Sequence, residues 1–293
     1  MKSFYYRRPS SIEEACDLLR EPSGQVKALA GGTDLLIATK QGKIRPNMVV
    51  SLRDIPRLSF IRVTPRSEAV IGSMISLEEI ESSNDIRRYL PAVAEAASYV
   101  GSPQVRSRAT VGGNLCHAAP SADMAPILMA YDASVVLADC GKERTVKLKD
   151  FFTGPGQTVL KSGELMREIH IPISPERSFG KYFKVWRSSM DIALVGVAVR
   201  VELEIGSEIC KNVRLILGAV GPTPIRAKAS ELIVEGKELS DDLVNEAAES
   251  AVKESRPISD VRSSESYRRH MVRVLTRRAL ESARSWAQKG GEL

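Results

Sequence analysis

Two pairs of adjacent glycines constrain this chain more than any other feature of its sequence. One pair lies in Thr110-Val-Gly-Gly-Asn114 and the other in Gly31-Gly-Thr-Asp34. Because glycine has no Cβ, two in succession let a backbone turn tightly and present consecutive N–H groups to an anion, as phosphate-binding loops do. A single pair between polar residues indicates no more than a turn. The presence of two similar pairs favours an anion-binding role.

The segment around the upstream pair predicts a strand, a turn and a helix in succession. Residues 26–30 are typical of a buried strand, and residues 35–40 of the first turns of a helix. In this arrangement a helix amino terminus and free N–H groups can meet a pyrophosphate. There is no G-x-G-x-x-G pattern, because Thr33-Asp34 follows the pair in place of a third glycine. The sequence therefore disfavours an NAD-type parallel sheet.

Length and composition indicate a soluble globular protein with two domains. The chain has 293 residues, of which 43% are hydrophobic and 27% charged. Its net charge of +6 comes from scattered Lys and Arg residues, and only 5% of the residues are aromatic, so no nucleic-acid partner is expected. The sequence shows no signal-peptide core and no apolar run long enough for a membrane span, which predicts a cytoplasmic protein.

Metal binding is not favoured by the cysteine and histidine content. Cys16, Cys116, Cys140 and Cys210 lie far apart without a Cys-x-x-Cys pair, which predicts four reduced and mostly buried thiols. His117 follows a cysteine, but the chain has only 3 His and no second ligand near it. We therefore expect no metal on this chain.

Short helices mixed with short strands predict an α+β fold. A helix is expected from Ser11 to Arg20, with Ser11 as its cap and Glu14 completing a capping box. Further helices are expected at 76–80, 90–100 and 125–130, and strands at 49–52, 59–63, 69–72, 135–138, 145–148 and 165–173. The pair at 59–63 and 69–72 suggests a hairpin. Polar residues around 174–179 place a domain boundary there.

The second half of the chain predicts a small antiparallel sheet backed by helices. Between residues 193 and 205, valines alternate with polar residues such as Arg200, Glu202 and Glu204. This pattern predicts a long strand with one buried face, and residues 213–217 are its expected partner. Helices are expected at 227–234, 241–253 and 264–288.

The two glycine motifs, at these positions in a chain of this length, resemble a known family. Together with Pro120-Ser-Ala-Asp123 they are similar to the FAD-binding medium subunit of the molybdenum hydroxylases, which include carbon monoxide dehydrogenase, xanthine dehydrogenase and aldehyde oxidoreductase flavoproteins. The resemblance extends over essentially the whole chain. It implies a two-lobed FAD-binding domain of the p-cresol methylhydroxylase type over residues 1–175, with lobes of about 1–56 and 57–175. The carbon monoxide dehydrogenase flavoprotein C-terminal domain would follow over 176–293.

The resemblance also implies a set of cofactor-binding residues. The two motifs would bind the FAD diphosphate and ribityl chain, chiefly through backbone N–H groups. One glycine would border the flavin, a carboxylate would accept hydrogen bonds from FAD hydroxyls, two apolar residues would pack nearby, and a lysine would sit close to the flavin ring. In that order, the residues are Leu29, Ala30, Gly31, Gly32, Thr33, Asp34, Leu35 and Leu36 with Thr110, Val111, Gly112, Gly113 and Asn114; then Gly101; Asp123; Leu160 and Ile169; and Lys184.

Some of these residues have a purely structural alternative. Asp123 could equally cap the helix expected after it, and Lys184 could be a solvated lysine on a strand. The aromatic residue that stacks on the flavin in some members has no match in the segment 187–192, where Met190 or Ile192 could fill the space. The four scattered cysteines cannot supply the extra cluster of benzoyl-coenzyme-A-type reductases, so that branch is disfavoured.

The implied function is electron transfer in a heterotrimeric molybdenum hydroxylase. A large subunit with molybdopterin would oxidise the substrate, a small subunit with 2Fe–2S clusters would relay electrons, and FAD on this chain would pass them to a soluble acceptor. No catalytic residue is expected on this chain, and the substrate cannot be named because another polypeptide would contact it. The alternatives are a free-standing FAD-dependent oxidoreductase of the same fold superfamily and a docking subunit that has lost its flavin.

Overall fold

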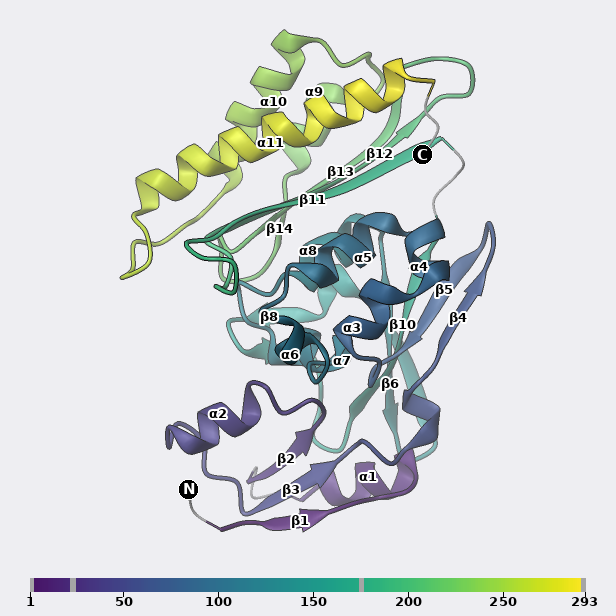
Figure 1. The fold of residues 1–293 in the computed structure, drawn as a ribbon, viewed down its shortest axis with the longest axis vertical. Coiled ribbons are helices and arrows are strands. Elements are labelled where there is room, and N and C mark those ends of the chain that lie inside the picture. Colours follow the sequence, from purple (N-terminus) through teal and green to yellow (C-terminus); the bar gives the residue numbers. More distant parts are fainter. Residues whose placement is uncertain (1–2, 22–24, 174–176, 291–293) are drawn as a thin grey trace.

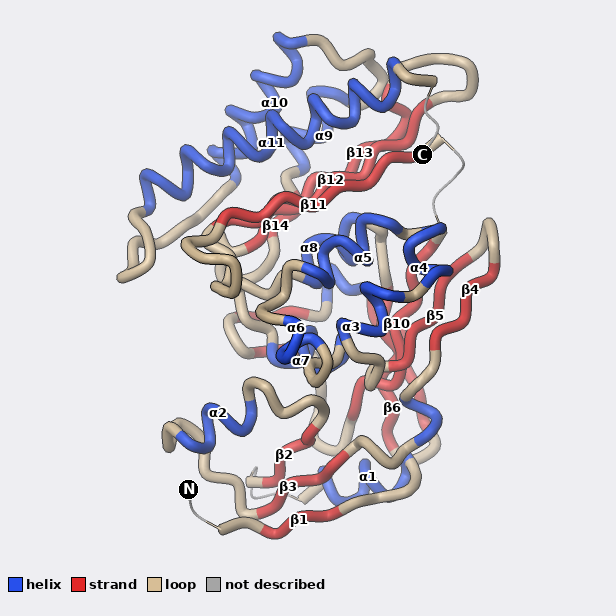
Figure 2. The backbone as a smooth tube through the Cα atoms, in the orientation of Figure 1, coloured by secondary structure: helices blue, strands red, loops and turns tan. Residues whose placement is uncertain are grey.

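The protein consists of three parts stacked along its long axis. The computed structural model describes residues 3–21, 25–173 and 177–290. Figure 1 shows a small amino-terminal lobe, a larger second lobe and a C-terminal domain that carries the longest helix. Figure 2 shows that each part has its own sheet with helices beside it, which is the predicted α+β arrangement. The predicted domain boundary at residue 175 lies outside the described residues.

The first lobe is a three-stranded parallel sheet in the order β1-β3-β2. Its parallel pairing was not predicted. Ser11 caps the first helix as predicted, since its hydroxyl accepts a hydrogen bond from the N–H of Glu14. The predicted capping box is incomplete, because the Glu14 carboxylate accepts from the N–H of Ser10. The elements are β1 (Tyr5–Arg7), α1 (Ile12–Leu19), β2 (Val26–Leu29), α2 (Leu35–Lys40) and β3 (Met48–Ser51).

The second lobe is an antiparallel five-stranded sheet in the order β4-β5-β10-β6-β7, with helices packed on one face. Ile71, Ile169 and Ile171 project from the sheet into the core under these helices. The predicted hairpin is confirmed as β4 and β5. The strands are β4 (Ile61–Thr64), β5 (Glu68–Gly72), β6 (Ser134–Asp139), β7 (Lys142–Lys147) and β10 (Leu165–Pro172), with a separate pair β8 (Phe152–Gly154) and β9 (Gln157–Thr158). The helices are α3 (Leu77–Ser82), α4 (Asn84–Tyr89), α5 (Pro91–Ser98), α6 (Pro103–Arg106), α7 (Val111–His117) and α8 (Met124–Ala130), with 3-10 turns η1 (Pro56–Leu58) and η2 (Leu148–Asp150).

The C-terminal domain is an antiparallel sheet in the order β11-β12-β13-β14, with helices along one side. The long strand predicted at 193–205 and its partner are confirmed as β12 and β13. The three predicted helices are confirmed as well. The elements are β11 (Ser178–Val185), β12 (Val195–Leu203), β13 (Cys210–Gly218), β14 (Ile225–Arg226), α9 (Lys228–Val234), α10 (Asp241–Glu254) and α11 (Glu265–Gln288).

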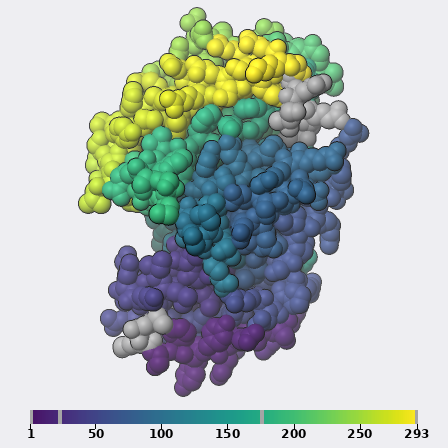
Figure 3. Space-filling view, in the orientation of Figure 1, coloured from purple at the N-terminus to yellow at the C-terminus, as the bar shows by residue number. Residues whose placement is uncertain are grey.

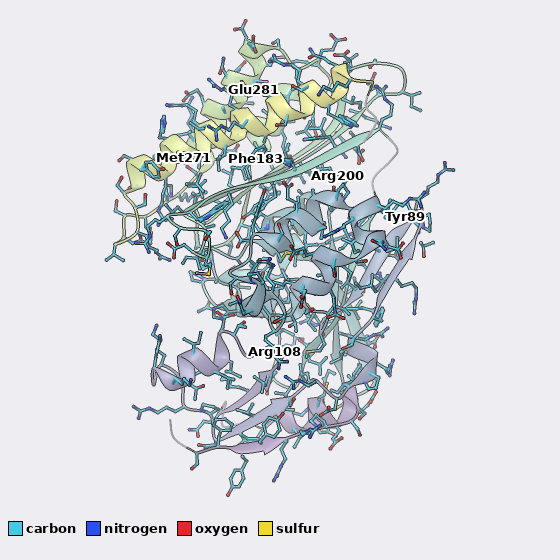
Figure 4. All side chains as sticks on the ribbon, in the orientation of Figure 1. Tyr89, Arg108, Phe183, Arg200, Met271 and Glu281 are labelled. Atoms are coloured by element: carbon cyan, nitrogen blue, oxygen red, sulfur yellow. The ribbon has the colours of Figure 1, made fainter. Side chains whose placement is uncertain are left out.

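Both faces of this sheet are buried, so the predicted one-sided burial of β12 is wrong. Val197, Val199 and Val201 pack into the core shared with the C-terminal helices. On the opposite face, Ala198 and Arg200 are also buried, because α8 of the second lobe packs against β12 and α5 packs against β11. Figure 4 shows Arg200 between the sheet and the helices of the second lobe. This junction brings residues of β11 next to the predicted cofactor site.

Candidate functional site

The turn between β2 and α2 leaves a row of backbone donors unpaired. Gly32 has a φ of +80°, a left-handed conformation that glycine adopts without strain. The N–H groups of Gly32, Thr33 and Asp34 donate to no backbone or side-chain acceptor among the residues that the structure describes. Successive free N–H groups in such a turn form a concavity that suits phosphate oxygens. The geometry of this turn therefore suits the anion-binding role predicted for it.

The second glycine pair forms the first turn of α7, where the sequence suggested a loop. Thr110 is the N-cap, and its hydroxyl accepts a hydrogen bond from the N–H of residue 113 at 3.0 Å. The other N–H groups of residues 111–114 donate to the carbonyls of Ile75, Ser73 and Thr110. The expectation that this pair offers free N–H groups to FAD is therefore wrong. Gly112 instead provides space, because a Cβ there would lie 2.5 Å from the Cβ of Ser73.

The two glycine motifs are in contact. A Cβ on Gly31 would lie 1.9 Å from the carbonyl oxygen of Arg108, so only glycine lets these two backbones approach so closely. A Cβ on Gly113 would lie 3.5 Å from the Cβ of Ala30. Figure 4 shows Arg108 where the first lobe meets the second. Figure 3 shows the surface indented on the left, between the purple first lobe and the teal and green parts above it. The expected approach of the two motifs from two lobes is thus found.

Asn114 has a buried side-chain oxygen without a partner. Its Oδ1 accepts no hydrogen bond from the described part of the chain. Because an unpaired buried polar atom costs about 1–3 kcal/mol, this atom fits a donor supplied by a ligand. FAD has hydroxyl donors on its ribityl chain and ribose, and its diphosphate has acceptors for the free N–H groups of residues 32–34. The residues present therefore fit the cofactor that the resemblance implies.

A buried ion pair joins the C-terminal domain to the second lobe. Nζ of Lys184, on β11, lies 2.8 Å from Oδ2 of Asp123, which precedes α8. The two side chains are only 1% and 6% exposed, so a solvated strand lysine is ruled out. The hydroxyl of Tyr182 donates to Oδ1 of the same carboxylate at 2.9 Å. The side chain of Asp123 makes no capping hydrogen bond to α8, which rules out the capping alternative.

The electrostatics of this cluster follow from its burial. Burial raises the pKa of the Asp123 carboxyl, while the charge of Lys184 and the hydrogen bonds from Lys184 and Tyr182 act in the opposite direction. Burial also raises the pKa of Tyr182 well above its ordinary value, and the nearby carboxylate adds to this effect. Tyr182 therefore stays protonated and acts as a donor. Two donors thus hold the Asp123 carboxyl group in one orientation.

The sequence-based prediction missed the aromatic residues beside Lys184. Its Nζ also donates to the carbonyl of Tyr99 at 2.8 Å and lies 5.4 Å from the ring centroid of Trp186. The Tyr99 ring packs near those of Trp186 and Tyr182, with centroid separations of 5.7 and 6.2 Å. A signal for this cluster was available, because residues 182, 184 and 186 alternate along β11 and the residue just after it and so share a face.

The other residues predicted to lie near the cofactor differ in how deeply they are buried. Gly101 follows closely after Tyr99 and has a φ of +54°. Leu160 is partly buried at the edge of the second-lobe core, and Ile169 is fully enclosed in that core, on the strand against which α7 packs. Met190 and Ile192, which were suggested to replace a stacking aromatic, are 64% and 47% exposed. Ile169 therefore presents no free surface to a ligand.

His117 lies close to the first glycine motif. Its Nε2 is 3.7 Å from Oδ1 of Asp34, so the last residue of α7 lies beside the residue that precedes α2. Two of the four free cysteines are buried and two are partly exposed. Within the described ranges, no His, Cys, Asp and Glu residues are grouped so as to hold a metal ion. Across those same ranges we find no helix with the length and apolar character needed to cross a bilayer.

Comparison with family profiles divides the chain into two matched regions. The profile described as the FAD binding domain in molybdopterin dehydrogenase matches residues 2–174. The profile of the CO dehydrogenase flavoprotein C-terminal domain matches residues 181–283.

Individual relatives match over nearly the whole chain. The chain is 34% identical to the glyceraldehyde dehydrogenase medium chain of Sulfolobus acidocaldarius, covering 95% of this chain and 97% of the relative. It is 32% identical to a xanthine dehydrogenase FAD-binding subunit of Escherichia coli O157:H7, with 98% of each covered. Among solved structures it resembles a carbon monoxide dehydrogenase from Hydrogenophaga pseudoflava that lacks the Mo-pyranopterin moiety of the molybdenum cofactor, with a TM-score of 0.93, 34% identity and 98% of each chain covered.

Proposed function

Because the chain belongs to the FAD-binding medium subunits of the molybdenum hydroxylases, we propose that it transfers electrons within a heterotrimeric, cytoplasmic enzyme of this kind. Its FAD would take electrons from 2Fe–2S clusters of a small partner subunit and pass them to a soluble acceptor. A large partner subunit would hold molybdopterin and oxidise the substrate. The FAD-binding domain would end near residue 175, where the C-terminal domain would begin.

The contact between the two glycine motifs is the observation that carries this proposal. The free N–H groups of residues 32–34 would bind the FAD diphosphate. Asn114, with its unpaired Oδ1, would accept a hydrogen bond from a hydroxyl of the cofactor. The other residues of 29–36 and 110–114 would lie around the cofactor, and Gly112 and Gly113, by lacking side chains, would let α7 pack against Ser73 and Ala30.

The chain's own residues would supply position and charge. When bound, FAD supplies the redox chemistry by accepting and donating electrons. Lys184 is held in place by Asp123 and by the Tyr99 carbonyl, so its ammonium group would stay fixed beside the flavin, with the Asp123 carboxylate offsetting part of its charge. A fixed positive charge there favours added negative charge on the ring and raises its potential. Gly101 and Leu160 would border the cofactor.

The first test is the colour of the purified full-length chain and of Gly112→Val. The parent protein should be yellow with stoichiometric FAD. The valine side chain would collide with Ser73, since even a Cβ would lie 2.5 Å from its Cβ, so the variant should lose FAD. Gly141→Asn is the control and should keep FAD, because no heavy atom lies within 4 Å of an added Cβ there and asparagine tolerates the left-handed conformation of this residue, with its φ of +83°. A colourless native protein, or full retention of FAD in Gly112→Val, would contradict the site.

The second test is co-purification from cells that express the neighbouring genes. An electron-transfer subunit should bring down a molybdopterin subunit and a 2Fe–2S subunit with FAD still bound. A free-standing flavoenzyme would purify alone and yellow. A docking subunit without flavin would bring down partners but stay colourless, so the three functions give three different results.

A further inference from the structure

The face of β11 that points toward the second lobe changes from buried to partly open along its length. Tyr182, Lys184 and Trp186 lie on this face at alternate positions. Tyr182 is 1% exposed and Lys184 9% exposed, and Trp186, one residue past the end of the strand, is only partly buried. Phe183 lies on the opposite face, against the C-terminal helices, as Figure 4 shows. The open end of this row therefore lies where the C-terminal domain meets the second lobe.

Trp186 is held at this position by contacts with two neighbours. Its ring lies 5.7 Å from the ring of Tyr99, centroid to centroid, at an interplanar angle of 40°. Nζ of Lys184 is 5.4 Å from the indole centroid, within the range of a cation–π contact. The same Nζ donates to the carbonyl of Tyr99. The indole thus packs beside Tyr99, two residues before the turn at Gly101.

We propose that Trp186 is a positioning residue that forms one aromatic wall of the flavin site. The proposal rests on the proposed function, because it requires FAD to bind with its ring near Lys184. Flat aromatic surfaces pack well against planar ring systems, and a half-buried indole beside a fixed cation offers such a surface. Met190 and Ile192 are aliphatic and offer no aromatic face. Trp186 would therefore take the place that these residues were expected to fill.

The test uses the fact that the chain has 2 Trp. The second, Trp286, lies on α11 beside Phe179, with ring centroids 5.7 Å apart, in the core on the far side of the sheet. Indole in contact with excited flavin transfers an electron to it and recovers the electron in the dark, which quenches flavin fluorescence without net chemistry. Trp186→Phe should therefore brighten the bound flavin and lengthen its fluorescence lifetime. The matched control Trp286→Phe should leave both unchanged.

Two further measurements test the proposal even if the variants bind less FAD than the parent protein. In Trp286→Phe, which keeps only Trp186, added FAD should quench most of the tryptophan emission, whereas in Trp186→Phe the remaining emission should fall much less. Trp186→Ala should weaken FAD binding to the apoprotein by about 3- to 10-fold, and Trp186→Phe should restore most of it. Equal quenching in the two single-tryptophan proteins, with flavin brightness unchanged in Trp186→Phe, would overturn the proposal. If the parent chain binds no FAD at all, the proposed function itself fails.

Discussion

Replacing Lys184 by methionine removes one charge from an almost fully buried ion pair and keeps an unbranched side chain of similar length. In the parent protein the ammonium donates to the carboxylate of Asp123 and to the carbonyl of Tyr99. After the change, the carboxylate keeps only the hydroxyl of Tyr182 as a donor in a site where its side chain is 6% exposed. Removing one partner of a buried pair costs about 3–5 kcal/mol. We expect the free energy of unfolding of the apoprotein to fall by that amount near neutral pH.

The loss of unfolding free energy in Lys184→Met should grow as the pH rises. Burial already raises the pKa of Asp123, and Lys184 opposes that rise, so the variant should have a still higher pKa. A carboxyl group whose pKa is higher in the folded state stabilises the protein most below its unfolded value, about 4. Stability then falls by about 1.4 kcal/mol per pH unit until the folded-state pKa is passed. Lys184→Met should therefore be closest to the parent in acid.

Urea unfolding of the apoprotein at several pH values measures this effect. The matched control is Lys181→Met on the same strand, because Lys181 pairs with Glu95 at 2.6 Å but is 36% exposed, and such pairs contribute no more than about 1 kcal/mol. Adding Asp123→Asn to Lys184→Met removes the stranded charge and should restore part of the stability. Equal losses in the two lysine variants, or a loss in Lys184→Met that is the same at every pH, would refute the reasoning.

Substitutions at three other places in the fold should change FAD binding or stability by different amounts. Gly31→Ala places a Cβ 1.9 Å from a backbone oxygen, so this variant should lose FAD and about 1–3 kcal/mol of stability. Gly113→Ala should lose less FAD and less stability, because the nearest atom to its Cβ is a hydroxyl oxygen at 2.9 Å. Equal losses in the two variants would argue against the backbone contact at Gly31. Ser76→Ala breaks a complete capping box at α3 and should cost about 1 kcal/mol, measured as a lower urea midpoint with an unchanged slope. For His170, burial lowers the pKa, but hydrogen bonds and charges from two glutamates outweigh it and the net shift is upward. That stabilisation is complete below the unfolded pKa of about 6.5 and is lost as pH rises through the folded value, so His170→Gln should cost stability in acid and little in alkali; a loss that increases with pH would contradict this.

Local sequence patterns identified the first glycine motif and most of the strands correctly. The stretch from Val26 to Lys40 contains its own apolar strand, glycine turn and helix start, so short-range preferences decide its structure. For the second motif the sequence predicts a loop, since glycine is a poor helix former. In the fold, the Thr110 cap and the fit of Gly112 against Ser73 outweigh that preference. The contact with Ser73 belongs to the packing of the second lobe and leaves no trace in the local pattern.

Contacts between domains explain what the sequence could not show. The alternation of residues along β12 predicts a solvent-exposed face at Arg200, but helices that come earlier in the chain cover that face. The same packing converts Lys184 from an ordinary strand lysine into the buried partner of Asp123, 61 residues away. Since no local pattern specifies which distant helix will cover a strand, neither the burial of Lys184 nor the contact of Trp186 with Tyr99 could be predicted from the sequence. Under the proposed function, the C-terminal domain would complete the site, because Lys184 and Trp186 both come from β11 and the residue just after it.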